Sequence, residues 1–265
     1  MGFFTGEKSP GMIDWATMPT YNTIMSTAAG VGLLLTVWFF IELRRASKQP
    51  GAQPDADPTL GSETRHLNTT GWALAFLIPG AILFIMGLHM ALTWPLAAGG
   101  FPFDNVIFGE PSIAFGALLI AAAVFLFRRG ARLNTVANPL RYAAQTARPV
   151  SLFIAAIGLA LIAIAFAGVT FQLFAAPPQE PISGNFAAWP WLEASFISLV
   201  YALIGIGAIL FPFSVTKVAR AEDAAAASGA LLKWNGVLWI IPGIVWVLFG
   251  ALNFYTHIGL IVNTM

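Results

Sequence analysis

The sequence predicts an all-α integral membrane protein with six transmembrane helices, and three observations predict that class. Hydrophobic residues make up 58% of the 265 residues and charged residues only 9%, whereas soluble domains are about 25% charged. Six segments are apolar over the roughly 20 residues that a helix needs to cross a bilayer. Twelve of the thirteen Lys and Arg residues lie in three alternate connections between these segments. We therefore expect residues 1–265 to form a single integral membrane domain.

The six predicted spans follow one another along the chain, separated by polar connections. They cover residues 22–43, 72–94, 111–127, 150–174, 194–213 and 235–258. The first span ends at Arg44 and Arg45, and Glu42 is expected to pair with one of these bases at the inner interface. Pro79 in the second span and Pro242 in the sixth lack an amide hydrogen, so both helices are expected to bend there.

The basic residues also orient the chain. Short loops that carry Lys and Arg stay on the cytoplasmic side of a membrane. The three basic connections hold twelve bases against six acids, whereas the opposite face holds Lys8 against six acids. With six spans, this places both termini outside. We expect the inner face to contact anionic lipid headgroups. No basic stripe with interleaved aromatics indicates nucleic-acid binding.

Recurring motifs predict a repeated helical hairpin. Ile-Pro-Gly, with a further Gly seven residues on, occurs at 78–87 in the second span and at 241–250 in the sixth. A Glu two residues before a Ser opens both the third span, at Glu110, and the fifth, at Glu193. Spans two and three and spans four and five are thus predicted to be two copies of one hairpin, with span six a third copy of its first helix. Because both hairpins leave from the inner face, the repeat is parallel, about an axis along the membrane normal.

Six polar side chains are expected to gather at the outer membrane level, the amide of Asn105 and five ionisable groups. His89 lies about one turn inside span two, His257 lies near the outer end of span six, and Asp104 lies in the loop between spans two and three. Glu110 and Glu193 open spans three and five. Ionisable residues at membrane depth are costly and often functional, and two His with carboxylates suit a divalent metal such as zinc or copper. A carboxylate at a helix N-terminus is also explained by the helix dipole alone, so both interpretations stay open.

The residue types in the sequence exclude some cofactors and disfavour others. The chain has no cysteine, which excludes disulfides, thiolate-held iron–sulfur clusters and a cysteine nucleophile. Haem b is disfavoured, because the repeat pairs His89 with Leu252 and so sets His89 and His257 roughly 7–8 Å apart in depth. No phosphate-binding loop, dinucleotide fingerprint, HExxH or Ser-His-Asp arrangement occurs. These observations favour a protein that is not an enzyme.

Two short segments resemble a known family. Residues 93–96 read Thr-Trp-Pro-Leu, and residues 105–111 read Asn-Val-Ile-Phe-Gly-Glu-Pro. With the surrounding spans, they resemble the bacterial and archaeal multi-span membrane proteins grouped as domain of unknown function 981. The resemblance implies a multi-pass protein of a bacterial or archaeal plasma membrane. It brings no established activity that could be assigned to these residues.

Three functions are left open, in order of preference. Small-residue packing faces and the lack of a polar path across the bilayer favour a non-catalytic subunit of a larger, energy-transducing membrane complex, in contact with other membrane subunits or further copies of the chain. The outer His, Glu and Asp residues favour a small-solute or metal transporter or binding protein. The outer aromatic belt favours an enzyme acting on a lipid or quinone, for which the sequence offers no nucleophile or acid–base pair.

Overall fold

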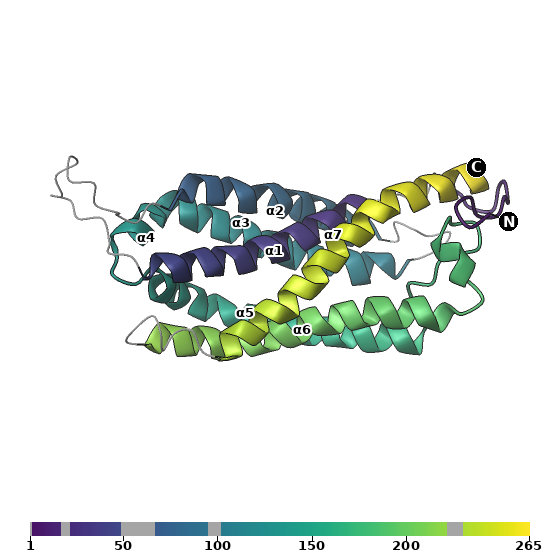
Figure 1. The fold of residues 1–265 in the computed structure, drawn as a ribbon. Coiled ribbons are helices and arrows are strands. Elements are labelled where there is room, and N and C mark those ends of the chain that lie inside the picture. Colours follow the sequence, from purple (N-terminus) through teal and green to yellow (C-terminus); the bar gives the residue numbers. More distant parts are fainter. Residues whose placement is uncertain (1, 17–21, 49–66, 95–101, 222–229) are drawn as a thin grey trace.

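Six long α-helices form the body of the protein, and short helices and loops join them at its two ends (Figure 1). The computed structural model describes residues 2–16, 22–48, 67–94, 102–221 and 230–265. The long helices are α1 (Asn22–Ala46), α2 (Thr69–Leu92), α3 (Glu110–Arg129), α5 (Pro139–Thr170), α6 (Pro190–Arg220) and α7 (Ala230–Thr264). The short elements are η1 (Asn105–Gly109), a π-helical turn that leads into α3, α4 (Ala131–Thr135) and η2 (Ser183–Phe186). These described ranges contain no strand, so the fold is all-α, as predicted.

Each long helix is able, by length and composition, to cross a membrane. The candidate spans are Thr23–Ala46, Thr69–Leu92, Asn105–Arg129, Pro139–Thr170, Pro190–Arg220 and Ala230–Thr264. A helix satisfies its own backbone hydrogen bonds, which lipid cannot do, so apolar helices of this length are stable in a bilayer. The chain is a multi-pass membrane protein with six candidate spans, as predicted.

The two ends of the bundle carry different side chains. Both chain termini lie at one end, the terminal end, beside the loop of residues 171–189 (Figure 1). The opposite end, the basic end, carries the bases of the last turns of α1, α3 and α6, namely Arg44, Arg45, Arg128, Arg129, Lys217 and Arg220. This separation follows the predicted distribution of charge. That the terminal end faces the outside stays a prediction.

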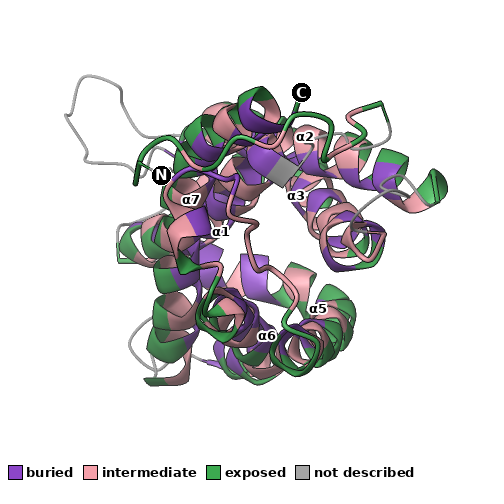
Figure 2. Cartoon of the chain, turned by 90° about the vertical axis from the view of Figure 1, so that its right-hand side faces the viewer, coloured by how far each residue is buried: buried purple, intermediate pink, exposed green. Residues whose placement is uncertain are grey.

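The long helices pack as three antiparallel pairs, α2 with α3, α5 with α6, and α7 with α1 (Figure 2). Each pair crosses where a glycine of one helix faces a glycine of the other. These glycines are Gly80 and Gly116, Gly158 and Gly205, and Gly243 and Gly30. A Cβ on the second glycine of each pair would lie 2.8, 2.8 or 2.6 Å from the carbonyl oxygen of the first. Such close backbone approach is how helices associate in lipid, so the first and last helices form a third hairpin like the other two.

The crossings bear on the predicted repeat in two ways. The Ile-Pro-Gly motifs of α2 and α7 place their glycines at equivalent points, each against a glycine of the partner helix. The Glu-x-Ser motifs fall in different registers. When the crossing glycines of α3 and α6 are aligned, Glu110 corresponds to Leu199, and Glu193 lies six residues earlier in α6. The repeat stays a prediction, supported by the glycine crossings and not by the Glu-x-Ser motifs.

An N-terminal strap, residues 2–16, lies across the terminal end. The Ser9 amide donates to the Asn263 carbonyl at 2.8 Å, in the last turn of α7. The Glu7 amide donates to the Pro178 carbonyl at 3.1 Å, in the loop between α5 and α6. The strap therefore ties the end of α7 to that loop.

Several helices begin earlier than the predicted spans, and α5 and α7 do so by the most. α5 starts at Pro139 and not at residue 150, because Asn138 caps it and its Oδ1 accepts from the Arg141 amide at 2.9 Å. Proline suits this first turn, since its missing amide hydrogen would have no partner there. α7 starts at Ala230 and runs on to Thr264, past the predicted limits of 235 and 258. The charged residues at the basic end thus continue the helices beyond their apolar part.

The predicted ion pair of Glu42 is confirmed at the basic end. Arg45 Nη1 donates to Glu42 Oε1 at 2.7 Å, and Trp38 Nε1 lies 3.3 Å from the same oxygen. Arg45 is well exposed, so the pair adds little to stability. That this end of α1 lies at the inner interface stays a prediction.

Candidate functional site

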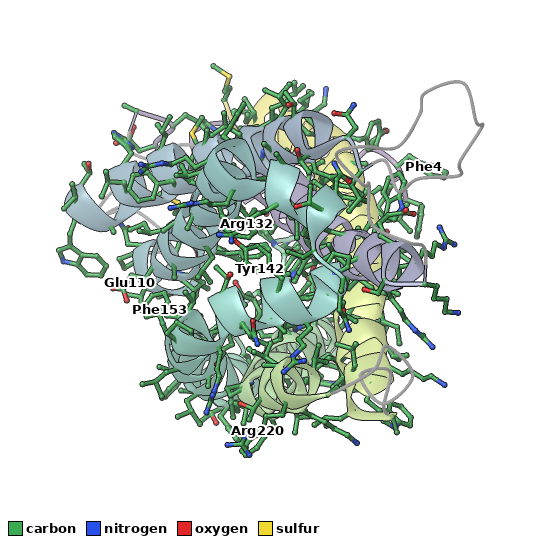
Figure 3. All side chains as sticks on the ribbon, turned by 90° about the vertical axis from the view of Figure 1, so that its left-hand side faces the viewer. Phe4, Glu110, Arg132, Tyr142, Phe153 and Arg220 are labelled. Atoms are coloured by element: carbon green, nitrogen blue, oxygen red, sulfur yellow. The ribbon has the colours of Figure 1, made fainter. Side chains whose placement is uncertain are left out.

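The five residues predicted to form an outer site all lie near the terminal end, but on different sides of it. Glu110 is exposed at the start of α3, at the edge of the bundle (Figure 3), and His89 lies on an exposed face of α2. Asp104 is half-buried before η1, Glu193 lies in the first turn of α6, and His257 lies near the end of α7. In the described part of the chain, no three His, Asp or Glu side chains come close enough to hold a metal ion. A metal site at these five residues stays a prediction.

Two of the five, Glu193 and His257, lie within electrostatic range of a further acid, Glu180. Glu180, in the loop between α5 and α6, is buried and acts electrostatically on both Glu193 and His257. Glu193 Oε2 accepts from the Ala176 amide at 2.7 Å, and His257 Nδ1 lies 2.6 Å from the Thr23 hydroxyl oxygen. The group joins α1, α6, α7 and the loop at the terminal end. Glu180 was not among the predicted site residues, since only the folded loop brings it to the helix ends.

Asp104 lies outside this group, directly before η1. It acts electrostatically on Tyr201, whose hydroxyl donates to the Ile107 carbonyl at 2.8 Å. Burial raises the pKa of the Asp104 carboxyl from its ordinary 3.8 to about 7, because the ionised form loses hydration. Asp104 therefore changes charge near neutral pH, next to the hydrogen bond that holds η1 against α6.

A cavity of about 350 Å³ lies between the three hairpins. All six long helices contribute to its wall, and they surround it in the view along the bundle (Figure 2). Aliphatic and aromatic side chains dominate the wall, among them Phe115, Phe211, Trp239 and Trp246, and none of the lining residues is charged. Pockets that enclose small molecules have volumes of about 300–1,000 Å³ and mostly apolar walls. The cavity therefore has the size and chemistry of a site for a small apolar ligand.

The cavity reaches the outside of the bundle between α3 and α5, which make few contacts with each other. At the basic end the rings of Phe125 and Tyr142 meet, with centroids 6.1 Å apart. At the terminal end those of Phe108 and Phe174 meet, 6.0 Å apart. Between these two ring pairs, three side chains both line the cavity and are exposed. They are Ala121 on α3, and Thr146 and Val150 on α5. We call this opening on the outside of the bundle the lateral window.

The few polar side chains of the cavity wall differ in their hydrogen bonding. The hydroxyls of Thr36 and Thr146 donate to carbonyls one turn earlier in their own helices, at 2.8 and 3.1 Å. The Ser26 hydroxyl donates to the backbone of α7 at 2.9 Å. Asn253 is 5% exposed and lines the cavity, and within the described ranges its amide makes no hydrogen bond. An amide inside an apolar span was the sequence signal for Asn253, and sequence reasoning missed it.

Comparison with known proteins finds one family. A family model described as Protein of unknown function (DUF981) matches residues 18–259, a range that includes nearly the whole helical bundle. No curated protein and no solved structure matches the chain. The matched range contains both segments on which the sequence resemblance rests, although residues 95–96 of the first segment lie outside the described residues.

Proposed function

The chain belongs to the family described as Protein of unknown function (DUF981), and on that premise we propose its function from the geometry of its cavity. The protein binds a lipid-soluble molecule, which enters sideways from the bilayer through the lateral window. The membrane, proposed from the family resemblance, is a bacterial or archaeal plasma membrane. The observation that carries this proposal is the opening between α3 and α5.

An opening that faces lipid admits molecules that are dissolved in lipid. Ala121 and Val150 leave a passage between the helices because their side chains are short. A molecule that moves from lipid into an apolar cavity gains little from the hydrophobic effect, since both surroundings are apolar. Its affinity must come from close packing against the wall and from any polar group that the wall satisfies.

The wall favours a neutral ligand. None of the residues that line the cavity is charged, and a charged group placed there would lose its hydration without a compensating partner. No acid–base pair lines the cavity either, so we propose binding and not catalysis. A transporter of a metal or a small polar solute would have to use the residues of the terminal end, Glu180, Glu193 and His257, outside this cavity.

The role of non-catalytic subunit stays a second proposal, because the outside of the bundle would suit it. Large apolar side chains such as Trp38, Leu152 and Phe166 are exposed there. A partner subunit or a further copy of the chain could cover these side chains in place of lipid. Purification in mild detergent tests this role. A partner that copurifies in fixed proportion supports it, whereas a monomer that binds ligand counts against it.

The binding function is tested by closing the lateral window. The chain has no cysteine, so Ala121→Cys with Val150→Cys gives one pair of thiols across the window. The protein is placed in phosphatidylcholine nanodiscs, and a reducible bifunctional thiol reagent joins the pair. We expect cross-linking before addition of radiolabelled hexadecanol to exclude the label, and cross-linking after addition to trap it. Reduction should restore exchange in both cases.

Three controls make this result specific. Each single-cysteine variant, treated with the same reagent, should exchange label as the wild type does. Val150→Trp should lower label uptake without any reagent, since its ring would occupy the window. Unchanged exchange in a protein whose cross-link is verified by mass would rule out entry through the window.

A further inference from the structure

Asn253 stands apart from the other buried asparagines. Asn235 donates from Nδ2 to the Gly207 carbonyl at 2.6 Å, and Asn263 donates to the Gln179 carbonyl at 2.8 Å. Asn105 donates from Nδ2 to the Met90 carbonyl, although its Oδ1 accepts no hydrogen bond in the described part of the protein. The amide of Asn253 is equally buried and lines the cavity, yet it has no partner in the described part of the protein. Buried amides are normally hydrogen-bonded, so an amide that points into a cavity without a partner indicates a ligand.

The polar groups are divided along the length of the cavity. Asn253 lies toward the terminal end, close in the chain to the last turns of α7. Toward the basic end the wall is formed by Phe40, Phe125 and Trp239, and the Thr36 and Thr146 hydroxyls there are bound within their own helices. A ligand that matches this wall has one polar end and one apolar end.

We infer that the ligand is a neutral lipid whose head carries a hydroxyl or carbonyl oxygen, bound with that oxygen at the Asn253 amide. The inference rests on the proposed function and specifies its ligand class. The apolar chain runs toward the basic end, between the aromatic side chains. An amide offers two donors and one acceptor, so it can hold a carbonyl or a hydroxyl oxygen equally well. A phosphate or carboxylate head is disfavoured, because no base lines the cavity.

Two hydroxyls of the same cavity wall support this assignment. Ser26 and Tyr201 already donate their hydrogens to backbone carbonyls, at 2.9 and 2.8 Å. Each therefore offers a lone pair to the cavity and no free hydrogen. Asn253 supplies the N–H donors for a ligand oxygen. If the head is a hydroxyl, its hydrogen can bond to the amide oxygen or to one of these lone pairs.

The test compares two probes of equal chain length, radiolabelled hexadecanol and radiolabelled hexadecane. Binding to the wild-type protein in phosphatidylcholine nanodiscs is measured for each, corrected for the partition of the probe into lipid. We expect the alcohol to bind about tenfold more tightly than the alkane, the size of effect that one hydrogen bond in an apolar site gives. In Asn253→Leu the two probes should bind alike, at the affinity that the wild type has for the alkane. Ser26→Ala, whose hydroxyl hydrogen is already bonded, should retain most of the preference.

The possible results separate this inference from the proposed function. If the wild type binds both probes equally, Asn253 is not a head-group site, while the cavity still binds lipid. If Asn253→Leu keeps the preference for the alcohol, another residue recognises the head. If neither probe binds, the proposed function itself fails. The wild-type comparison needs no variant and decides the question even if Asn253→Leu does not fold.

Discussion

The three hairpins meet along three seams, and one seam is built differently from the other two. α1 packs against α2, and α6 packs against α7, whereas α3 and α5 make few contacts. Aromatic rings fill the first seam, where Trp38 and Phe39 lie against Trp72 with centroids 5.4 and 5.1 Å apart. In the second, the rings of Phe211 and Trp239 lie 5.3 Å apart. The third seam holds the lateral window.

One residue position distinguishes the seams. Eight residues before the crossing glycine, α2 has Trp72, α7 has Asn235 and α5 has Val150. Trp72 packs on the rings of α1, and Asn235 bonds to the backbone and to a hydroxyl of α6. Val150 is short and apolar, and it lines the open window. The window therefore arises from small side chains in one seam, while the helices on both sides keep their own hairpin crossings. Val150→Trp would introduce in α5 the tryptophan that α2 has at the equivalent position, Trp72.

The largest effect is expected at the crossings, because the seams exist only while the hairpins stay packed. In Gly116→Ala the new Cβ would lie 2.5 Å from the Phe84 amide nitrogen and 2.8 Å from the Gly80 carbonyl oxygen. Both are backbone atoms and cannot rotate away. We expect the free energy of unfolding to fall by about 2–3 kcal/mol. Unfolding of the purified protein in detergent micelles measures this loss.

Gly236→Ala is the matched control for that variant. Its Cβ would meet only Val37 Cγ1, at an ordinary contact distance of 3.6 Å. Alanine is also the better helix former, by about 0.5–1 kcal/mol. Gly236→Ala should thus be neutral or slightly stabilising. Equal losses in the two variants would show that the glycine crossings do not hold the hairpins together.

A smaller loss is expected when a closed seam is opened. Asn235→Leu removes the bonds from α7 to the Gly207 carbonyl and to Ser214 and leaves the Ser214 hydroxyl buried without that partner. We expect a loss of about 2 kcal/mol in the free energy of unfolding. Asn253→Leu, the same change in the same helix, should cost much less, since its amide has no described partner to lose. Similar losses in both would contradict the contrast between a seam asparagine and a cavity asparagine.

The smallest effect concerns pH at the terminal end, where Asp104 lies beside the contact of η1 with α6. Its folded pKa of about 7 exceeds the ordinary 3.8, so the folded protein holds the proton more tightly than the unfolded chain. The contribution to stability is complete below about pH 4 and is lost as the pH rises through about 7. A rise of the pKa from 3.8 to about 7 bounds this loss at about 4 kcal/mol. We expect a measured loss on the order of 1 kcal/mol, because water that reaches the half-buried carboxyl screens the effect.

Asp104→Asn should remove this part of the pH dependence. The free energies of unfolding of the two proteins, measured between pH 4 and pH 8, should therefore diverge as the pH rises, with the variant less affected. Parallel curves would mean that the Asp104 carboxyl titrates as it does in the unfolded chain.

The features that could be predicted from sequence are those that depend on local composition. Six helices and a basic end follow from the apolar runs and the positions of Lys and Arg, and the pair of Glu42 with Arg45 joins neighbouring turns of one helix. The early start of α5 was also readable, since Asn138 before Pro139 is a helix cap. A search for spans that requires mainly apolar residues leaves out such polar first turns.

The site depends on which face each helix turns inward, and no local pattern specifies that. Asn253 faces the cavity only because α7 packs on α1 and α6. Val150 lies at the window only because α3 makes few contacts with α5. Its position relative to the crossing glycine shows this only after the folded helices have been aligned. Glu180 approaches His257 through a folded loop. In each case the decisive contact joins segments far apart in the chain.

The pairing of α1 with α7 has a consequence for biogenesis. These are the first and the last of the described helices, and a chain that is inserted as it is made places α1 in the membrane well before its partner exists. Until α7 arrives, the face of α1 around Gly30 has to be covered by lipid or by an insertion factor. Assembly therefore includes an intermediate in which α1 is in the membrane without its partner helix. The helix α7 carries Asn253, so the cavity receives this amide only when α7 is inserted.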